Sequence, residues 1–419
     1  YEVLGWRGVW GWDPGENASF MPWLTGTAIY HSVLVQERRG MLRVWNLSLL
    51  VAPFSLTILG TFLTRAGVLN SVHAFSESHI GPSLLTFFAV VVVASIALIG
   101  WRGDRLRSPG AIDSPASREG AFLANNVLFG VFTFVVLLGT TFPLVVEALQ
   151  NREVKVGAPY YDRLTAPLGI CMLTLMAIAP VLPWRKASQE LLRDRLFWPA
   201  WCGVLAIAVS VIVGADGIQS ILAFGLGGFA AGSALRQLVL ATRRQGWRGF
   251  VGRANGGMVV HLGVIIIAVA LAASNAYTHT QRLVLDKGES ASFAGHTFKF
   301  LEATQETDAR RISQKAQVLI DGRHTYAPAI PRYTLTGMQV GTPSVKTGPV
   351  KDLYLTLDEM PADGSRATIR VSIKPMVLWI WVGGLILLLG TALAAFPGRS
   401  RRKPTDPVSA PVPVAAGEP

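Results

Sequence analysis

The chain has 419 residues, of which 51% are hydrophobic and only 15% are charged. Soluble globular proteins carry about 25% charged residues, so this composition excludes an ordinary soluble domain. The formal net charge of +12 would suit a nucleic-acid partner. Whether this charge indicates a nucleic-acid partner depends on where along the chain the basic residues lie.

Nine apolar stretches are long enough to cross a bilayer, since a helix of about 20 residues spans its hydrocarbon core. They cover approximately residues 18–37, 42–63, 81–100, 121–147, 164–183, 197–214, 218–240, 256–276 and 376–396. We therefore expect an all-α polytopic membrane protein with about nine transmembrane helices.

The basic residues cluster at alternate ends of these stretches. The main clusters include Arg38 and Arg39, Arg102 and Arg105, Arg185 and Lys186, Arg243 and Arg244, and Arg401 and Arg402. Cytoplasmic loops of membrane proteins carry the excess of Lys and Arg, so residues 1–17 are predicted outside and the C-terminus in the cytoplasm. The positive charge is thus a topology signal, and no nucleic-acid partner is expected.

The remaining segments divide the chain further. Residues 1–17 are an external segment rich in tryptophan, residues 18–276 hold spans one to eight, and residues 376–396 hold the last span. Residues 277–375 alternate apolar and polar residues in short runs separated by turn pairs such as Asp321-Gly322, which predicts a small β-rich domain on the outer face. The Pro- and Ala-rich residues 397–419 are predicted to be a disordered cytoplasmic tail.

Two histidines lie inside predicted spans, where ionisable residues are costly and are functional candidates. His31 is six residues before Glu37, and His261 is eight residues after Arg253. At 1.5 Å per residue, both lie roughly 10 Å from the cytoplasmic boundary. Two imidazoles at equal depth are able to ligate one haem iron. The alternative is two independent hydrogen bonds between helices.

The external segment reads Trp6-Arg7-Gly8-Val9-Trp10-Gly11-Trp12-Asp13. Indole rings offer wide flat faces, and glycines allow close approach, so the pattern suits a planar ligand such as a porphyrin. An interfacial aromatic belt explains the tryptophans equally well. The run that follows, Asp13-Pro14-Gly15-Glu16, also predicts a helix start with a capping box, a structural role for the two acids.

The remaining candidates carry weaker signals. His73 lies in the outer loop after the second span and shares that face with the tryptophan segment. Cys171 and Cys202 lie in apolar spans without metal-ligand spacing, so we expect small packing residues of the core.

These residues together resemble a known family of haem-handling membrane proteins. Residues 6–19, with Pro22-Trp23-Leu24, are similar to its tryptophan-rich "WWD" signature, and the fuller match resembles the CcmF, NrfE and CcsA group of haem lyases, the CcmF branch above all. Residues 61–75, Asp352-Leu353-Tyr354 and Trp379-Ile380-Trp381 agree with that branch. The resemblance covers essentially the whole chain, and because the chain starts at Tyr1 without an initiator Met we expect further sequence upstream.

The resemblance implies roles for individual residues. His31 and His261 match the axial ligands of a membrane-embedded, bis-histidine b haem. His73 matches one of two outer histidines that ligate incoming haem, and the other would lie upstream of Tyr1. The outer haem contacts would be Trp6, Trp10, Trp12 and Asp13. Arg7 and Gly15 depart from the family pattern.

The implied activity is a haem lyase of cytochrome c maturation in the bacterial inner membrane, acting on the periplasmic face. Haem would arrive from the chaperone CcmE, and the CXXCH motif of apocytochrome c from a CcmH/CcmI-type partner. Two other classes stay open. A haem carrier or exporter without ligase activity predicts an outer haem and no b haem, and a membrane b-type electron-transfer protein predicts the reverse.

Overall fold

The computed structural model describes residues 10–66, 80–108, 111–334, 339 and 341–396. These residues form two compact units. The first, here called the helical unit, comprises Trp10–Ala206 and Gly228–Arg253, and the second, called the β-containing unit, comprises Ile207–Gly227 and Ala254–Ala395. Predicted site residues Trp6 and His73, and the predicted tail after residue 396, lie outside the described residues.

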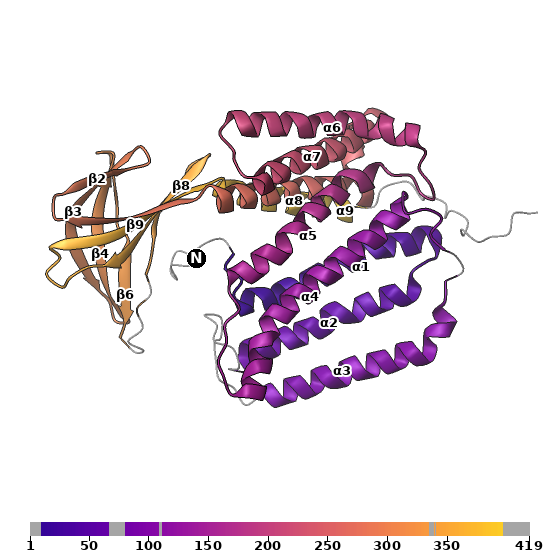
Figure 1. Cartoon of the computed structure of the whole chain (residues 1–419), viewed down its shortest axis with the longest axis horizontal. Helices are drawn as coiled ribbons and strands as arrows, with labels where there is room; N and C mark the ends of the chain where they lie inside the picture. The colour runs from indigo at the N-terminus through magenta and orange to yellow at the C-terminus, as the bar shows by residue number, and fades with distance from the viewer. Residues whose placement is uncertain (1–9, 67–79, 109–110, 335–338, 340, 397–419) are drawn as a thin grey trace, which may run out of the picture. The chain divides into compact units, whose positions relative to one another are not determined.

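Nine α-helices occur in the described part of the chain, and each coincides with one of the predicted spans (Figure 1). They are α1 (Pro14–Arg39), α2 (Arg43–Arg65), α3 (Gly81–Arg102), α4 (Arg118–Gln150), α5 (Ala158–Ile178), α6 (Gln189–Ile212), α7 (Ile218–Gln245), α8 (Arg253–Ala276) and α9 (Val377–Ala395). Eight of them, α2 to α9, are long and apolar enough to cross a membrane. The chain is a multi-pass membrane protein.

Helix α1 is the exception, although its 26 residues exceed the length that a bilayer requires. Its interior carries polar side chains, among them Asn17, Thr25, His31, Ser32 and Gln36, which lower its mean hydropathy. Several of them are buried between helices and not exposed to lipid, as with Asn17 and Ser32. The position of α1 within the membrane stays a prediction.

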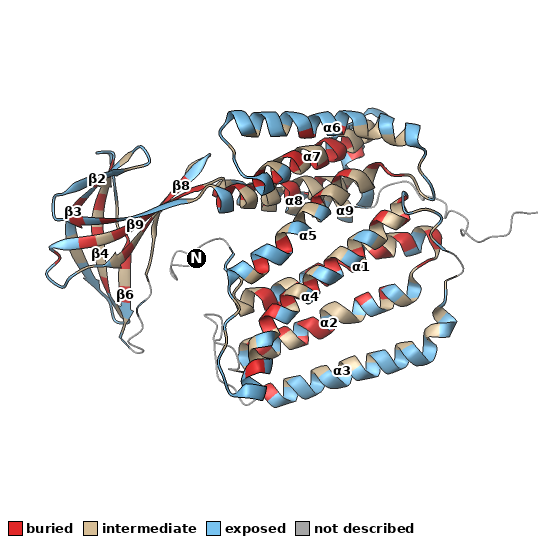
Figure 2. Cartoon of the chain, in the orientation of Figure 1, coloured by how far each residue is buried: buried red, intermediate tan, exposed pale blue. Residues whose placement is uncertain are grey.

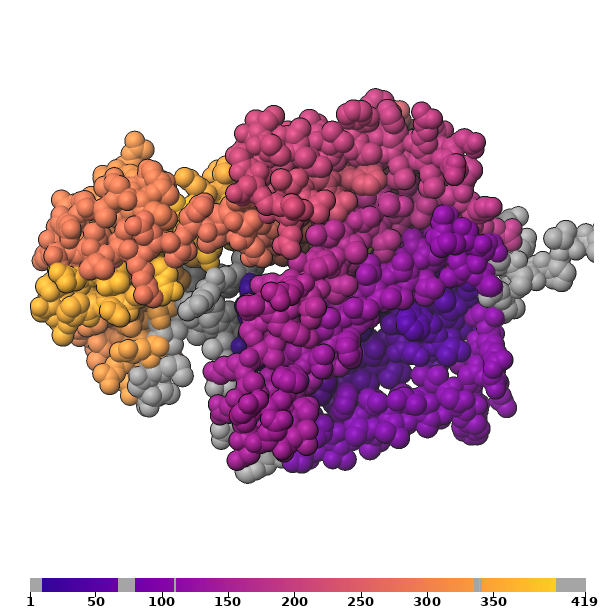
Figure 3. Space-filling model, in the orientation of Figure 1, coloured from indigo at the N-terminus to yellow at the C-terminus, as the bar shows by residue number. Residues whose placement is uncertain are grey.

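Apolar side chains join α1 to α2 and α4. Met21 and Leu24 of α1 are completely buried, and they pack near Leu56 of α2 and Phe129 and Val136 of α4. By contrast, Gly81 is the one buried residue of α3, and the rest of this helix is pale blue or tan in Figure 2. Figure 3 shows α3 along one border of the helical unit, separated from α4 by a hollow. Its uniformly apolar surface is the surface expected of a helix that faces lipid.

Polar side chains also link the helices of this unit. Asn46 of α2 donates to Gln36 Oε1 at 2.6 Å. The side-chain amide of Asn126 on α4 has one orientation in which both its nitrogen and its oxygen form hydrogen bonds. In that orientation the nitrogen donates to the Ala28 carbonyl, and the oxygen accepts from Trp45 Nε1 and from the Ser32 hydroxyl. Such interhelical hydrogen bonds hold membrane helices together because lipid offers polar groups no alternative partner.

A charged cluster closes one end of the helical unit. Arg39 and Glu119 are almost fully buried, and Arg39 Nε lies 3.0 Å from Glu119 Oε1. The backbone N–H of Arg185 donates to both carboxylate oxygens of Glu119, and Asp113 lies 3.6 Å from the Arg39 guanidinium. Every member is therefore paired, which buried charges require.

The described residues of the β-containing unit form nine strands between α8 and α9. They are β1 (His279–Asp286), β2 (Ser290–Phe293), β3 (His296–Thr307), β4 (Arg311–Ile320), β5 (His324–Tyr326), β6 (Ala329–Tyr333), β7 (Ser344–Lys346), β8 (Lys351–Glu359) and β9 (Arg366–Pro375). One antiparallel sheet has the order β1-β9-β8-β7, and the other has the order β2-β3-β4-β5 with β6 also pairing with β4.

The two sheets enclose one apolar core. Phe298 and Phe300 of β3, Val318 of β4, and Ile369 and Val371 of β9 are all completely buried. Along β1, β4, β8 and β9 buried residues alternate with more exposed ones over much of the strand, as the sequence alternation predicts. The β4–β5 turn contains Asp321 and Gly322, both with positive φ (54° and 68°), as the predicted Asp-Gly turn requires. The predicted β-rich insertion before the last helix is confirmed.

The expectation for the cysteines was wrong. Cys171 of α5 and Cys202 of α6 are exposed at the helix surface and not buried in the core. In a membrane helix an apolar position faces either lipid or a neighbouring helix, and hydropathy does not distinguish the two.

Candidate functional site

The tryptophan segment is tied to the start of α5. The indole of Trp12 stacks on the ring of Tyr161, with ring centroids 4.8 Å apart and planes only 8° from parallel. Its Nε1–H donates to Asp162 Oδ1 at 2.8 Å. Tyr161 and Asp162 were not among the predicted site residues. The sequence does carry a signal for them. An aromatic residue and an acid follow Pro159, which marks the start of the helix, and they lie at the predicted outer end of that span.

The backbone of the segment is anchored as well. The buried Asn17 amide donates to the carbonyl of Trp12 at 3.2 Å and to the hydroxyl of Thr140 at 3.0 Å. Thr140 in turn lies 3.4 Å from the Tyr161 hydroxyl. One network therefore connects the segment to α1, α4 and α5.

The acids after the segment form the predicted capping box. Asp13 Oδ2 accepts from the Gly15 N–H at 2.9 Å, and Glu16 Oε2 accepts from the N–H groups of Asp13 and Gly11 at 3.2 Å and 2.9 Å. The structural role predicted for the two acids is thus confirmed. Because Glu16 also holds Gly11, the capping box fixes the chain that joins Trp10 to Trp12.

A row of aromatic rings lies beside the anchored indole. The Trp10 ring meets Phe20 edge-on at 5.2 Å, and Phe20 stacks on Trp23 at 5.7 Å. Trp10 and Trp23 are 38% and 50% exposed. This row, Trp10–Phe20–Trp23, presents flat apolar rings with polar N–H edges, which suits a planar aromatic ligand and also a membrane interface.

His31 lies on α1 in an aromatic environment. Its ring is 5.8 Å from the ring of Phe122 and 6.4 Å from that of Phe129. Nδ1 lies 2.9 Å from the carbonyl oxygen of Thr27, which only accepts hydrogen bonds. In the neutral ring the proton is therefore on Nδ1 and the lone pair is on Nε2, the arrangement that orients a histidine as a metal ligand.

His261 lies on α8 in the β-containing unit, and the packing of α8 determines which way it faces. A Cβ on Gly263 would come within 2.6 Å of the Gly383 carbonyl, and one on Gly256 within 2.4 Å of the Ala394 nitrogen. These glycines form the face of α8 that packs on α9. At 100° per residue, His261 lies about 150° around the helix from that face, so it points away from α9.

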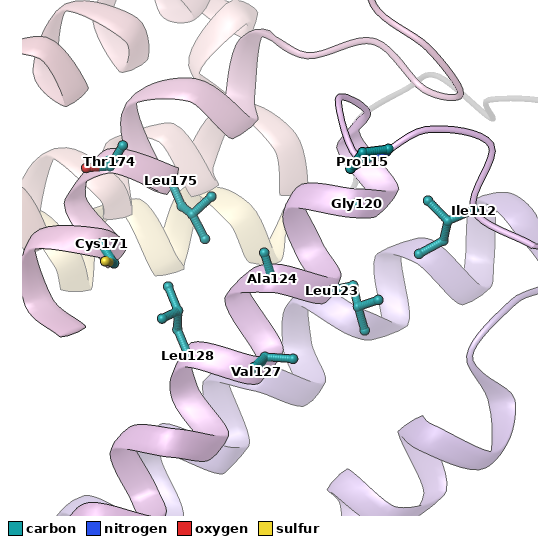
Figure 4. A pocket seen from close by; sticks show the side chains of 10 residues that line it. All are labelled: Ile112, Pro115, Gly120, Leu123, Ala124, Val127, Leu128, Cys171, Thr174 and Leu175. Carbon is teal, nitrogen blue, oxygen red and sulfur yellow. The ribbon is translucent and has the colours of Figure 1, made fainter.

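A groove of about 800 Å³ lies between α4 and α5 of the helical unit (Figure 4). It is lined by Ile112, Pro115, Gly120, Leu123, Ala124, Val127, Leu128, Cys171, Thr174 and Leu175. The Thr174 hydroxyl donates to the Ile170 carbonyl of its own helix. Specific ligand sites combine apolar walls with a few placed polar groups, which these lining residues do not supply. None of the predicted site residues lines this groove.

Comparison with known proteins agrees with the resemblance seen in the sequence. A family model described as cytochrome C assembly protein matches residues 2–69. The cytochrome c-type biogenesis protein CcmF of Pseudomonas aeruginosa is 35% identical over 413 residues, covering 96% of this chain and 63% of that protein. CcmF of Escherichia coli is 34% identical over 424 residues, covering 98% of this chain and 64% of that protein.

A solved structure named Cytochrome c Heme Lyase CcmF matches 95% of this chain and 62% of its own, with a TM-score of 0.80 and 31% identity. The chain is homologous to the CcmF family of cytochrome c biogenesis proteins. It spans about 63% of the length of the Pseudomonas relative. The membrane helices and the β-rich insertion are thus features shared with that structure.

Proposed function

We propose that the chain acts in cytochrome c maturation as a haem lyase in the bacterial inner membrane. Its homology to proteins named for cytochrome c biogenesis and haem lyase activity supports the proposal. So does the row of exposed rings at Trp10 and Trp23, beside the anchored Trp12. The proposed outer haem site rests on this row. The predicted contacts Trp6, Asp13 and His73 would complete the site.

The proposed reaction joins haem to apocytochrome c on the periplasmic face. Each thiol of the CXXCH motif adds across a haem vinyl group, so an S–C bond forms, the C=C double bond becomes single, and the thiol proton ends on the other vinyl carbon. No net oxidation occurs. The protein contributes orientation, and holding two reactants in place is worth several kcal/mol of the barrier. Haem would be delivered by CcmE, and the apocytochrome by a CcmH/CcmI-type protein.

A second haem, of b type, is proposed in the membrane with His31 and His261 as axial ligands. The Nε2 lone pair of His31 and the aromatic rings around it fit such a group. His261 lies on the side of α8 opposite the face that packs on α9, so its ring does not take part in the contact between these two helices. When bound, the haem would supply a one-electron redox centre.

A related function would be the maturation of a different c-type cytochrome. The probable cytochrome c-type biogenesis protein NrfE of Escherichia coli is 29% identical over 406 residues. That likeness is lower than the likeness to the CcmF proteins, which are 34–36% identical, so the general maturation role is the one we propose. A carrier without ligase activity and a b-type electron-transfer protein remain the competing classes that the experiment separates.

The test is a reduced-minus-oxidised visible spectrum of the detergent-purified protein, with a pyridine haemochrome assay. Wild type is expected to show a non-covalent b-type signal that His31→Ala and His261→Ala each abolish. His324→Ala, on a strand of the β-containing unit, is the matched control. A wild-type b signal that survives both membrane substitutions contradicts the ligand assignment. If outer haem binds and holocytochrome forms without any b-type signal, the electrons come from a different source. If outer haem binds and no holocytochrome forms, the result favours a carrier.

A further inference from the structure

Trp12 adopts a backbone conformation that needs support from its surroundings. Its φ is +55°, in the left-handed region that is unfavourable for a residue with a Cβ. Such conformations persist where neighbouring contacts hold them, and they concentrate at functional sites. The side chain of Trp12 and the groups it touches are therefore expected to have a role in placing the segment.

Two neighbouring residues of α5 engage the indole from different directions. Tyr161 covers one face of the ring and is itself only 2% exposed, so the ring on which Trp12 rests is held by its own neighbours. Asp162 accepts the indole N–H at 2.8 Å. The stack fixes the plane of the ring, and the hydrogen bond fixes its rotation within that plane.

Holding Trp12 also sets the direction of Trp10. The two indoles meet edge-on, with centroids 5.9 Å apart and planes at 88°. Aromatic pairs prefer this T-shaped geometry. Trp10 is 38% exposed, whereas Trp12 has one face and its N–H occupied, so Trp10 is the ring of the pair that is presented to a ligand.

We propose that Tyr161 and Asp162 are positioning residues of the outer site. They clamp Trp12 in place, and Trp12 orients Trp10 and with it the row Trp10–Phe20–Trp23, whose two tryptophans are exposed, for a planar ligand. Within the proposed function, on which this inference rests, that ligand is haem. Trp12 then acts as the anchor of the segment, and Trp10 and Trp23 provide the ring faces that meet the porphyrin.

The first test measures the clamp without haem. Hydrogen exchange of peptides covering residues 10–20 is followed by mass spectrometry on the whole chain in nanodiscs. Asp162→Ala and Tyr161→Leu are expected to accelerate exchange in this segment about tenfold, because local opening becomes easier. Asp162→Asn, which keeps an oxygen acceptor, and Tyr161→Phe, which keeps the stack, should stay near wild type. Arg163→Ala, one position further along α5, is the matched control.

The second test measures what the clamp does. Haem is titrated into the same proteins, and binding outside the membrane b site is followed by absorbance. Asp162→Ala is expected to weaken outer haem binding about tenfold while the b-type spectrum stays at wild-type intensity, and Asp162→Asn should restore binding. Trp12→Phe combined with Asp162→Ala should weaken binding no more than either change alone, because both remove the same hydrogen bond.

The outcomes separate this inference from the proposed function. Unchanged exchange in both Asp162→Ala and Tyr161→Leu would overturn the clamp. Faster exchange with unchanged haem affinity would show a purely structural contact and overturn the positioning role. If exchange accelerates as expected but wild type takes up no outer haem, the clamp stands and the proposed function fails.

Discussion

The β-rich insertion and the helices of the helical unit are stabilised in different ways. The insertion encloses a large core of apolar side chains, including Phe298, Phe300 and Ile369, and buries few charged side chains beside it, Asp352 and Lys374. The helical unit buries polar and charged groups such as Asn126 and Glu119 between its helices, while α3 leaves apolar side chains exposed. In water, apolar burial stabilises a fold, whereas lipid is as apolar as leucine and removes that driving force between helices. Polar contacts and close packing carry the association of the helices instead.

The largest expected effect comes from the apolar core of the insertion. Phe300→Ala should destabilise the β-rich region by about 3–5 kcal/mol, because a fully buried phenylalanine leaves a cavity. Limited proteolysis across a urea series, scored on fragments from residues 277–375, measures the change. The matched substitution Phe87→Ala on α3, where the ring is 51% exposed, should leave stability nearly unaltered in a bilayer. Equal losses from the two changes would remove the contrast between the regions.

A slightly smaller effect is expected from the buried charges. Glu119→Ala should cost about 3 kcal/mol, since it leaves Arg39 buried with its nearest carboxylate removed. Thermal unfolding in detergent, with Asp194→Ala on α6 as a control carboxylate, measures the loss. The double variant Arg39→Leu with Glu119→Leu should recover part of it, because no unpaired charge remains. A double variant no more stable than Glu119→Ala alone would show that the unpaired charge of Arg39 is not the cause of the loss.

The smallest effect concerns acid pH in the insertion. The hydrogen bond from His296 to Asp321 at 2.8 Å, followed by that from the Thr297 N–H, holds the pKa of Asp321 below its usual value. A carboxyl with a lowered folded-state pKa contributes stability above its unfolded pKa of about 3.8, and that stability is lost as pH falls through the lower, folded value. Asp321→Asn should therefore flatten the acid limb of the unfolding profile of residues 277–375. A profile that is unchanged below pH 4 would show that other carboxylates set it.

Much of the fold was predictable because its signals are local. Apolar runs long enough for a bilayer located the nine helices of the described residues. The alternating runs at 282–285, 297–301, 316–320, 353–357 and 368–373 likewise predict strands that lie within β1, β3, β4, β8 and β9. The short strands β2, β5, β6 and β7 were missed. Strands of three to five residues carry too few alternating positions to stand out from a loop, and their pairing partners are distant in sequence.

For the site, the sequence by itself determined which residue types are present: the tryptophans, the capping box of Asp13 and Glu16, and a histidine within α1. Tertiary structure alone decided that Trp12 rests on Tyr161 and Asp162, about 150 residues away. It likewise decided that Trp10 is exposed and that Cys171, which lines the groove beside α4, is exposed as well. Hydropathy and residue spacing indicate the secondary structure that a single segment prefers. Which face of an aromatic ring becomes covered depends on which helix, distant in sequence, packs against it.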